Sequence, residues 1–173
     1  MSSNTEAGHT KANGNATLAI ASLAAMATYL DSSVLFVAFP DITNSFSNAT
    51  TATLSWVLNA YTITFAALLV PAGKLGDRLG PRRALYVGSA IFTLASMVCG
   101  LAGSIELLIF ARVLQGVGAA VLVPSSLALV LAAFPREKLP QVVAIWGAMG
   151  AFSAALGPSL GGIIVNGLGW RWI

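Results

Sequence analysis

Charged residues are scarce in this sequence. Only 9% of its 173 residues are Asp, Glu, Lys or Arg, whereas 57% are hydrophobic, and the mean hydropathy is +0.82. A soluble domain carries roughly 25% charged residues, because water must solvate its surface. The shortage of charge therefore excludes a soluble globular domain and indicates an integral membrane protein.

Cysteine and histidine occur once each, as Cys99 and His9. One cysteine cannot form a disulfide within the chain. The sequence contains no cluster of metal-ligating residues, no paired carboxylates and no Ser/His/Asp set, and it contains no glycine-rich nucleotide-binding loop. We therefore expect neither an enzyme nor a bound metal or other cofactor.

Five apolar segments are long enough to cross a membrane, which takes about 20 residues in a helix. They cover residues 18–39, 54–72, 84–103, 105–130 and 142–168. In lipid the backbone must satisfy its own hydrogen bonds, and these segments are too long and too uniformly apolar for the strands of a sheet. The sequence therefore predicts an all-α integral membrane protein, with residues 18–173 forming one helical bundle.

Residues 1–17 differ from the rest, since they are rich in Ser, Asn, Thr, Gly and Ala. This composition predicts a short disordered tail. A cleaved signal peptide is the alternative, because small residues recur in the first apolar segment. Against it, that segment runs for 22 residues and the region before it is barely basic, unlike a signal peptide.

Most basic residues fall on one side of the predicted membrane. They are Lys11, Lys74, Arg78, Arg82, Arg83, Arg136 and Lys138. On the other side only Arg171 follows the fifth segment. Because cytoplasmic loops are enriched in Lys and Arg, the N-terminus is expected in the cytoplasm and the C-terminal end outside. The basic residues form no stripe with interleaved aromatics, so nucleic-acid binding is not expected.

Two opposite charges interrupt the apolar segments, Asp31 in the first and Arg112 in the fourth. Asp31 lies toward the end of the first segment and Arg112 toward the start of the fourth, and the two segments cross in opposite directions. The charges therefore lie at matching depth. An isolated charge near the bilayer centre costs at least about 2.5 kcal/mol, so we expect Asp31 and Arg112 to pair. Gln115 lies on the same helix face as Arg112, at i+3. The carboxylate then suits proton coupling, and the alternative is a static pair that only sets helix packing.

Other segments carry patterns of small or polar residues. In the fifth, small residues recur at spacings of three and four, at Gly147, Gly150, Ala154, Gly157 and Gly161. Such a stripe lets another helix lie close. In the second segment, Asn59 and Tyr61 are candidates to line a cavity.

A short segment between the second and third apolar runs, Gly73 to Arg83, holds five of the fifteen charged residues. Its glycines and charges predict a loop that faces the cytoplasm. The residues of this motif are Gly73, Asp77, Arg78, Gly80, Arg82 and Arg83.

Four motifs resemble those of one transporter family. The charged segment matches Gly-x-Leu-small-Asp-Arg-x-Gly followed by basic residues, with Pro81 at one usually basic position. The other matches are residues 30–34, then Arg112, Gln115, Gly116, Gly118 and Ala119, and then residues 157–162. The chain thus resembles the N-terminal half of a major facilitator superfamily transporter, in particular the fourteen-helix drug:proton antiporters.

The resemblance implies six helices packed against a pseudo-symmetric second bundle, with a substrate cavity between them. It implies that Asp31, Arg112 and Gln115 take part in proton or substrate coupling. It also implies that Asp77 and the neighbouring arginines contact the second bundle. The antiporter motif of the fifth helix would consist of Gly157, Pro158, Gly161 and Gly162.

The function implied by the resemblance is proton-coupled export of drugs or other small hydrophobic compounds across the cell membrane. The proton gradient would supply the energy, and the partners would be the lipid bilayer, protons, a small-molecule substrate and the missing C-terminal half. Two alternatives remain, namely a transporter of another small solute in the same superfamily, or a truncated fragment that does not transport. With five of the first six helices, the chain is expected to be truncated.

Overall fold

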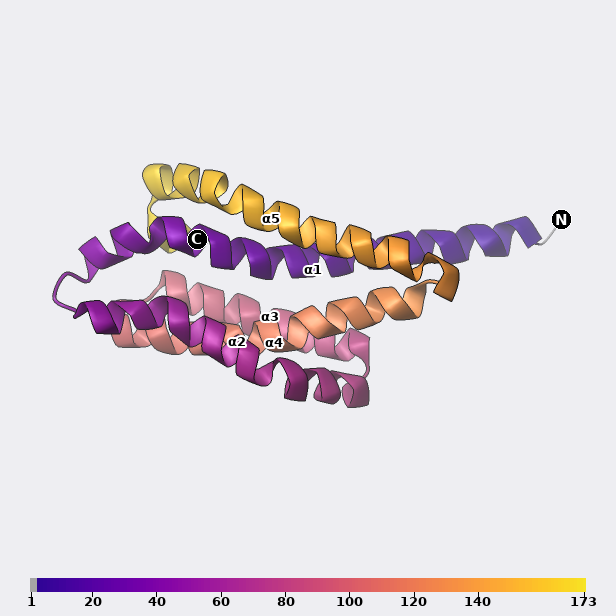
Figure 1. The fold of residues 1–173 in the computed structure, drawn as a ribbon, viewed down its shortest axis with the longest axis horizontal. Helices are drawn as coiled ribbons and strands as arrows, with labels where there is room; N and C mark the ends of the chain where they lie inside the picture. Colours follow the sequence, from indigo (N-terminus) through magenta and orange to yellow (C-terminus); the bar gives the residue numbers. More distant parts are fainter. Residues whose placement is uncertain (1–2) are drawn as a thin grey trace.

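A computed structural model describes residues 3–173 of the chain, with side chains from residue 14 onward (Figure 1). This part folds into five α-helices: α1 (Ser3–Ser45), α2 (Thr51–Leu79), α3 (Pro81–Gly100), α4 (Ile105–Ala133) and α5 (Leu139–Leu168). Two short 3₁₀-helices follow α4 and α5, η1 (Arg136–Lys138) and η2 (Trp170–Trp172). The described residues contain no strand, so the predicted all-α fold is confirmed.

All five α-helices of the described part are long and apolar enough to cross a membrane. The shortest, α3, has 20 residues, and a helix of that length spans about 30 Å, the thickness of the hydrocarbon core. Successive helices run in opposite directions, so their connections alternate between the two ends of the bundle (Figure 1). The chain is therefore a multi-pass membrane protein.

The helices form two groups that meet along α1 and α4. In Figure 1, α1 and α5 lie side by side in the upper part and α2, α3 and α4 in the lower part. The most extensive helix pairs are α3 with α4, α1 with α5, and α2 with α4, followed by α1 with α4. Because α4 touches both groups, it is the most buried helix of the bundle.

The N-terminal segment differs from its prediction. A disordered tail was expected over residues 1–17, but α1 begins at Ser3, and residues 14–17 are helical with described side chains. A helix already formed by the apolar segment extends at the gain of one hydrogen bond per residue. Gly14 is buried there, because a Cβ on it would lie 3.4 Å from the ring of Phe134. Residues 1–2 lie outside the described residues.

The charged segment Gly73 to Arg83 is not the loop that was predicted. Residues up to Leu79 continue α2, and Pro81 already begins α3, so Gly80 alone links the two helices. Gly80 has a φ of 85°, which glycine adopts without the steric cost of a side chain. Proline suits the first position of a helix because it needs no N–H partner there. One glycine and one proline therefore reverse the chain without a longer connection.

The predicted helix boundaries also need correction elsewhere. Prolines at positions 40, 71, 124 and 158 lie inside helices, and α1 and α2 extend well beyond the predicted ends. By contrast, the C-terminal end of α3 comes earlier than predicted, at Gly100 rather than at residue 103. Of the four prolines only Pro40 lies beyond a predicted segment, and neighbouring helices and local adjustments allow prolines inside membrane-spanning helices.

Most of the predicted small-residue stripe of α5 packs on α1, but Gly147 is exposed and has open space around its Cβ position. A Cβ on Gly150 would lie 2.9 Å from the ring of Tyr29, and one on Gly161 would lie 2.9 Å from Val34. At Gly157 the added atom would collide with the side chain of Ser33. The hydroxyl of Ser153 also donates a hydrogen bond of 2.7 Å to the Met26 carbonyl of α1. The two helices approach closely because these positions have little or no side chain.

Replacing Gly157 by alanine should destabilise the bundle. The new methyl group overlaps Ser33, and overpacking of this kind typically costs about 1–3 kcal/mol. The matched control is Gly162→Ala on the same helix, where an added Cβ meets open space. Reversible unfolding in detergent, followed by far-UV circular dichroism, measures both. Equal stability of the two variants would contradict the close α1–α5 contact.

Candidate functional site

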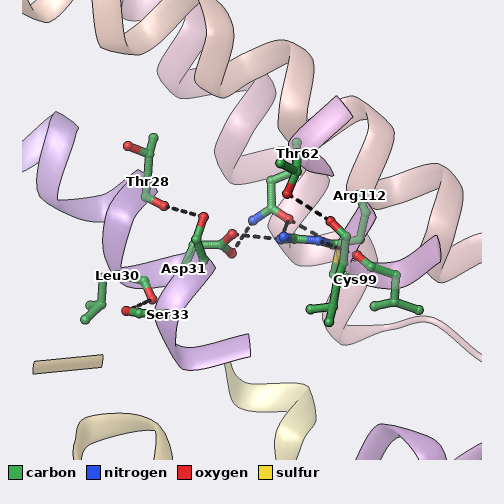
Figure 2. A network of polar contacts seen from close by, with 11 residues as sticks. Thr28, Leu30, Asp31, Ser33, Thr62, Cys99 and Arg112 are labelled. Atoms are coloured by element: carbon green, nitrogen blue, oxygen red, sulfur yellow. Dashed lines mark hydrogen bonds and ion pairs between the residues drawn. The ribbon is translucent and has the colours of Figure 1, made fainter. Parts of the chain in front are cut away.

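Asp31 of α1 and Arg112 of α4 meet inside the bundle (Figure 2). Arg112 Nη1 lies 2.7 Å from Asp31 Oδ2, and the two side chains are 3% and 11% exposed. This is the ion pair that the charges in the first and fourth segments predicted, and the structure confirms it. Within residues 14–173 it is the only ion pair.

Gln115 closes the pair into a ring of three side chains. Its amide Nε2 donates a 2.6 Å hydrogen bond to Asp31 Oδ1, and its Oε1 accepts one of 2.6 Å from Arg112 Nη1. Arg112 and Gln115 are one turn apart on α4, so both reach α1 from the same face. Each carboxylate oxygen of Asp31 thus accepts a bond from α4, and Gln115 is only 1% exposed.

Helix α2 holds the other side of the Arg112 guanidinium. Arg112 Nε donates to the carbonyl of Val57 at 3.3 Å, and its Cζ lies 4.3 Å from the ring centroid of Tyr61. A guanidinium over an aromatic face gains cation–π attraction, which is strongest where water is excluded. The arginine is therefore bound by groups from α1, α2 and α4.

Of the two cavity candidates on α2, only one belongs to this site. Tyr61 is buried against Arg112, whereas Asn59 lies on the exposed face of α2. With 3.6 residues per turn, side chains two positions apart point about 200° away from each other around the helix axis. Asn59 and Tyr61 therefore cannot share one face of α2.

The hydroxyl groups near Asp31 do not bind its carboxylate. Thr28, Ser32 and Ser33 each donate to a backbone carbonyl of α1, three or four residues earlier. Figure 2 shows the Ser33 hydroxyl pointing to Leu30, away from Arg112. Serine and threonine in helices commonly bond to the preceding turn in this way. Among the described residues, the side chains that bind the Asp31 carboxylate therefore come from α4.

Sequence reasoning missed two members of the site. The Val57 carbonyl is invisible in a side-chain pattern, because every residue has one. Cys99 of α3 lies with its Sγ 3.7 Å from Gln115 Oε1, and the only signal for it was a lone sulfur side chain within an apolar run.

A small cavity of about 30 Å³ borders the network. Asp31, Arg112 and Gln115 line it together with Trp170 and Arg171 from the C-terminal end. A polar cavity holds a water molecule when it exceeds about 10–15 Å³. There is therefore room beside Asp31 for about one or two water molecules.

Apolar layers enclose this polar layer along α4. On one side Leu108 packs with Leu35, Val57 and Trp170, and on the other Ala119 and Leu122 pack with Phe92. Between these layers the ring is largely buried, with Arg112 3% and Gln115 1% exposed. A charge in such a site interacts strongly with its partners, because little solvent screens it.

The charged motif lies at one end of the bundle and not at this ring. Asp77, Arg78, Arg82 and Arg83 are exposed, and Gly73 and Gly80 are half-buried. Buried Gly76, which the sequence did not single out, contacts α4, because a Cβ on it would lie 3.2 Å from Ser125 Oγ. In the part of the chain with described side chains, no residue of the motif forms an ion pair.

The predicted antiporter motif of α5 divides between two surroundings. Gly157 and Gly161 are buried against α1. Pro158 is exposed, and Gly162 is half-buried with open space around its Cβ position. Only half of this motif therefore serves the α1–α5 contact.

Comparison with known proteins identifies the family. The family model described as Major Facilitator Superfamily matches residues 21–173. The chain belongs to the major facilitator superfamily. Its predicted membership is thereby confirmed, and the ring of Asp31, Arg112 and Gln115 lies within the matched region.

Several curated relatives in the superfamily bear names of resistance and export proteins. The methylenomycin A resistance protein of Streptomyces coelicolor is 42% identical over 149 residues, which are 86% of this chain and 31% of that protein. The tetracenomycin C resistance and export protein of Streptomyces glaucescens is 38% identical, over 90% of this chain and 29% of that protein. The multidrug resistance protein Stp of Mycobacterium tuberculosis is 41% identical, with shares of 91% and 29%. The chain thus spans about a third of the length of these relatives.

The coupling energy between Asp31 and Arg112 can be measured with a double-mutant cycle. Asp31→Asn or Arg112→Gln alone leaves an uncompensated buried charge and should cost about 3–5 kcal/mol of unfolding free energy. The double variant should lose clearly less than the sum of the two. Unfolding titrations in detergent give the four free energies.

The control for this cycle is Asp41→Asn, on the same helix but outside the network. It should change the unfolding free energy by no more than about 0.5 kcal/mol. Strictly additive losses for Asp31→Asn and Arg112→Gln would rule out a direct interaction between these side chains.

Proposed function

We propose that this chain forms the N-terminal bundle of a secondary active transporter that exports drugs or other small hydrophobic compounds in exchange for protons. The observation that carries the proposal is the buried ring of Asp31, Arg112 and Gln115, which joins α1 to α4. The names of the relatives, as resistance and export proteins, support the choice of substrate class.

In the proposed mechanism Asp31 carries the proton. While it is ionised, Arg112 and Gln115 hold both of its oxygens, and α1 stays bound to α4. Protonation removes the charge that attracts Arg112, so the carboxyl binds α4 less strongly. Because α5 packs on α1, the change acts between the α1–α5 group and the group of α2, α3 and α4. A proton can thereby alter the relative position of helices that border a substrate cavity.

The proton gradient supplies the energy for this exchange, and no bound cofactor takes part. The described residues hold no group of three or more His, Cys, Asp or Glu side chains that could bind a metal. The protein would act as a carrier, with the second bundle, the lipid bilayer, protons and the exported compound as its partners.

We further propose that Asp77 and Arg78 of the charged motif contact the second bundle on the cytoplasmic side. Asp77 and Arg78 are exposed at the end of α2. Charged side chains at a helix end are available to a partner when no intrachain ion pair engages them, and none does so among residues 14–173. Such contacts would close the cytoplasmic side while the outer side is open.

The transport test uses the full-length protein that carries this chain, reconstituted in proteoliposomes with an imposed pH gradient. A panel of hydrophobic cationic dyes serves as substrate, and a pH-sensitive dye reports proton movement. The wild-type protein should move dye and protons in opposite directions. Asp31→Asn should reduce gradient-driven export to background while downhill dye movement persists, because the carrier is retained and its proton site is lost.

Glu106→Gln is the control for this experiment, since Glu106 is an exposed acid at the start of α4. It should retain proton exchange. Unchanged exchange in Asp31→Asn would refute the role of Asp31. Solute movement by the wild-type protein without proton exchange would favour a different transporter of the superfamily, and no movement by the 173-residue chain alone is expected.

The proposed orientation places the N-terminus, the Gly80 turn and η1 in the cytoplasm. Asn48→Cys and Lys138→Cys, each in a Cys99→Ser background, put a thiol at opposite ends of the bundle. A membrane-impermeant maleimide added to intact cells should label position 48 and not position 138. Labelling of both is expected after permeabilisation, and the reverse pattern in intact cells would contradict the orientation.

A further inference from the structure

A groove opens at the basic end of the bundle, between the first part of α1, the start of α3 and the last turns of α4. It consists of a pocket of about 370 Å³ and an adjoining one of about 220 Å³. The two share Thr17, Arg82 and Leu129 among their lining residues, so they form one continuous surface. We call it the α1–α3–α4 groove. The larger pocket is within the roughly 300–1,000 Å³ typical of ligand sites.

The walls of this groove are apolar over most of their length. Leu129, Ala132 and Ala133 of α4 form one wall, and Leu85 of α3 and Ile20 of α1 lie along its extension. These residues belong to helices that cross the membrane. The groove therefore runs along helices that span the membrane.

One end of the groove is strongly basic. Arg82 and Arg83 line it, both exposed, and among residues 14–173 no acidic residue lines either pocket. In the chain from residue 14 onward, neither arginine takes part in an ion pair. The groove thus combines two exposed cations, neither of them in an ion pair within residues 14–173, with an apolar channel.

The start of α3 adds to the positive end. Pro81 has no N–H, and the first intrahelical bond at this end runs from the Ala84 N–H to the Gly80 carbonyl, at 3.1 Å. The backbone N–H groups of Arg82 and Arg83 precede that bond, and no side chain caps the helix. Free N–H groups and the helix dipole favour an anion at such a position.

We propose that the α1–α3–α4 groove binds an anionic phospholipid, with its phosphate at Arg82 and Arg83 and one acyl chain along Leu129, Leu85 and Ile20. A soluble anion would leave the apolar walls unused, and an apolar compound would leave the arginines uncompensated. A lipid of the surrounding membrane matches both. Arginine suits the phosphate because its planar guanidinium can donate two parallel hydrogen bonds. This site is separate from the ring of Asp31 and does not rest on the proposed transport function.

The test measures lipid binding to the purified 173-residue chain by native mass spectrometry from a neutral detergent. Phosphatidylglycerol and phosphatidylcholine of equal chain length are the two probes. The wild-type chain should retain one phosphatidylglycerol in preference to phosphatidylcholine. Arg82→Gln with Arg83→Gln should weaken that binding at least about tenfold, since both arginines attract the anionic headgroup.

The matched control removes the same charge at the same end of the bundle. Arg136→Gln with Lys138→Gln lies in η1, outside the groove, and should leave phosphatidylglycerol binding within about threefold, since these charges act only through the screened surface field. An equal loss in the two double variants would overturn the proposal, because it would show unspecific attraction to charge. Equal retention of the two lipids by the wild-type chain would overturn it as well.

A second pair of variants tests the apolar wall without changing charge. Ala132→Trp narrows the groove and should weaken phosphatidylglycerol binding, whereas Leu131→Trp, on the same helix but not lining the groove, should not. The proposal would be overturned if millimolar inorganic phosphate displaced the lipid and Ala132→Trp had no effect. The groove would then be a simple anion site. Circular dichroism of each variant shows whether the helices are retained, so that a loss of binding can be assigned to the groove.

Discussion

The buried guanidinium of Arg112 is the constraint on which the rest of this bundle depends. Inside a membrane no bulk water solvates it, so protein groups must satisfy its charge and its donors. Asp31 supplies the counter-charge, Gln115 an amide oxygen and Val57 a backbone carbonyl. These groups come from α1, α4 and α2. Satisfying one side chain therefore ties three helices together at one depth, with apolar layers on both sides of the polar one.

The same interaction lies where two groups of helices meet. Small residues hold α5 on α1, and they also hold α4 against its neighbours, since a Cβ on Gly116 would lie 2.8 Å from the Tyr61 carbonyl of α2. Close packing makes each group stiff, because in lipid such contacts replace the hydrophobic effect as the source of helix association. The ion pair joins the stiff groups through a bond that depends on charge. A change of protonation at Asp31 would thus act on whole helices and not only on one side chain.

Much of this arrangement could be predicted from the sequence, because membrane burial leaves few choices for a charge. Asp31 and Arg112 had to find partners, and their depths matched, so their pairing followed. The stripe of glycines in α5 predicted a close helix contact but not that α1 would supply it. The turn at Gly80 was missed because glycines and charges suggested a loop, whereas a single residue at φ 85° reverses the chain. The contribution of Val57 could not be foreseen, since a backbone carbonyl leaves no trace in residue types.

The sequence by itself determined that the chain crosses a membrane five times over residues 14–173, which residues are charged within the apolar segments, and which end of the bundle is basic. Local composition suffices for these features, because lipid excludes unsatisfied polar groups whatever the neighbouring helices do. Only the tertiary structure decided that α4 is central, that Tyr61 and Cys99 contact the ring, and that α1, α3 and α4 leave a groove beside Arg82 and Arg83. These features depend on which helix faces meet, and residues that are distant in the chain jointly determine that.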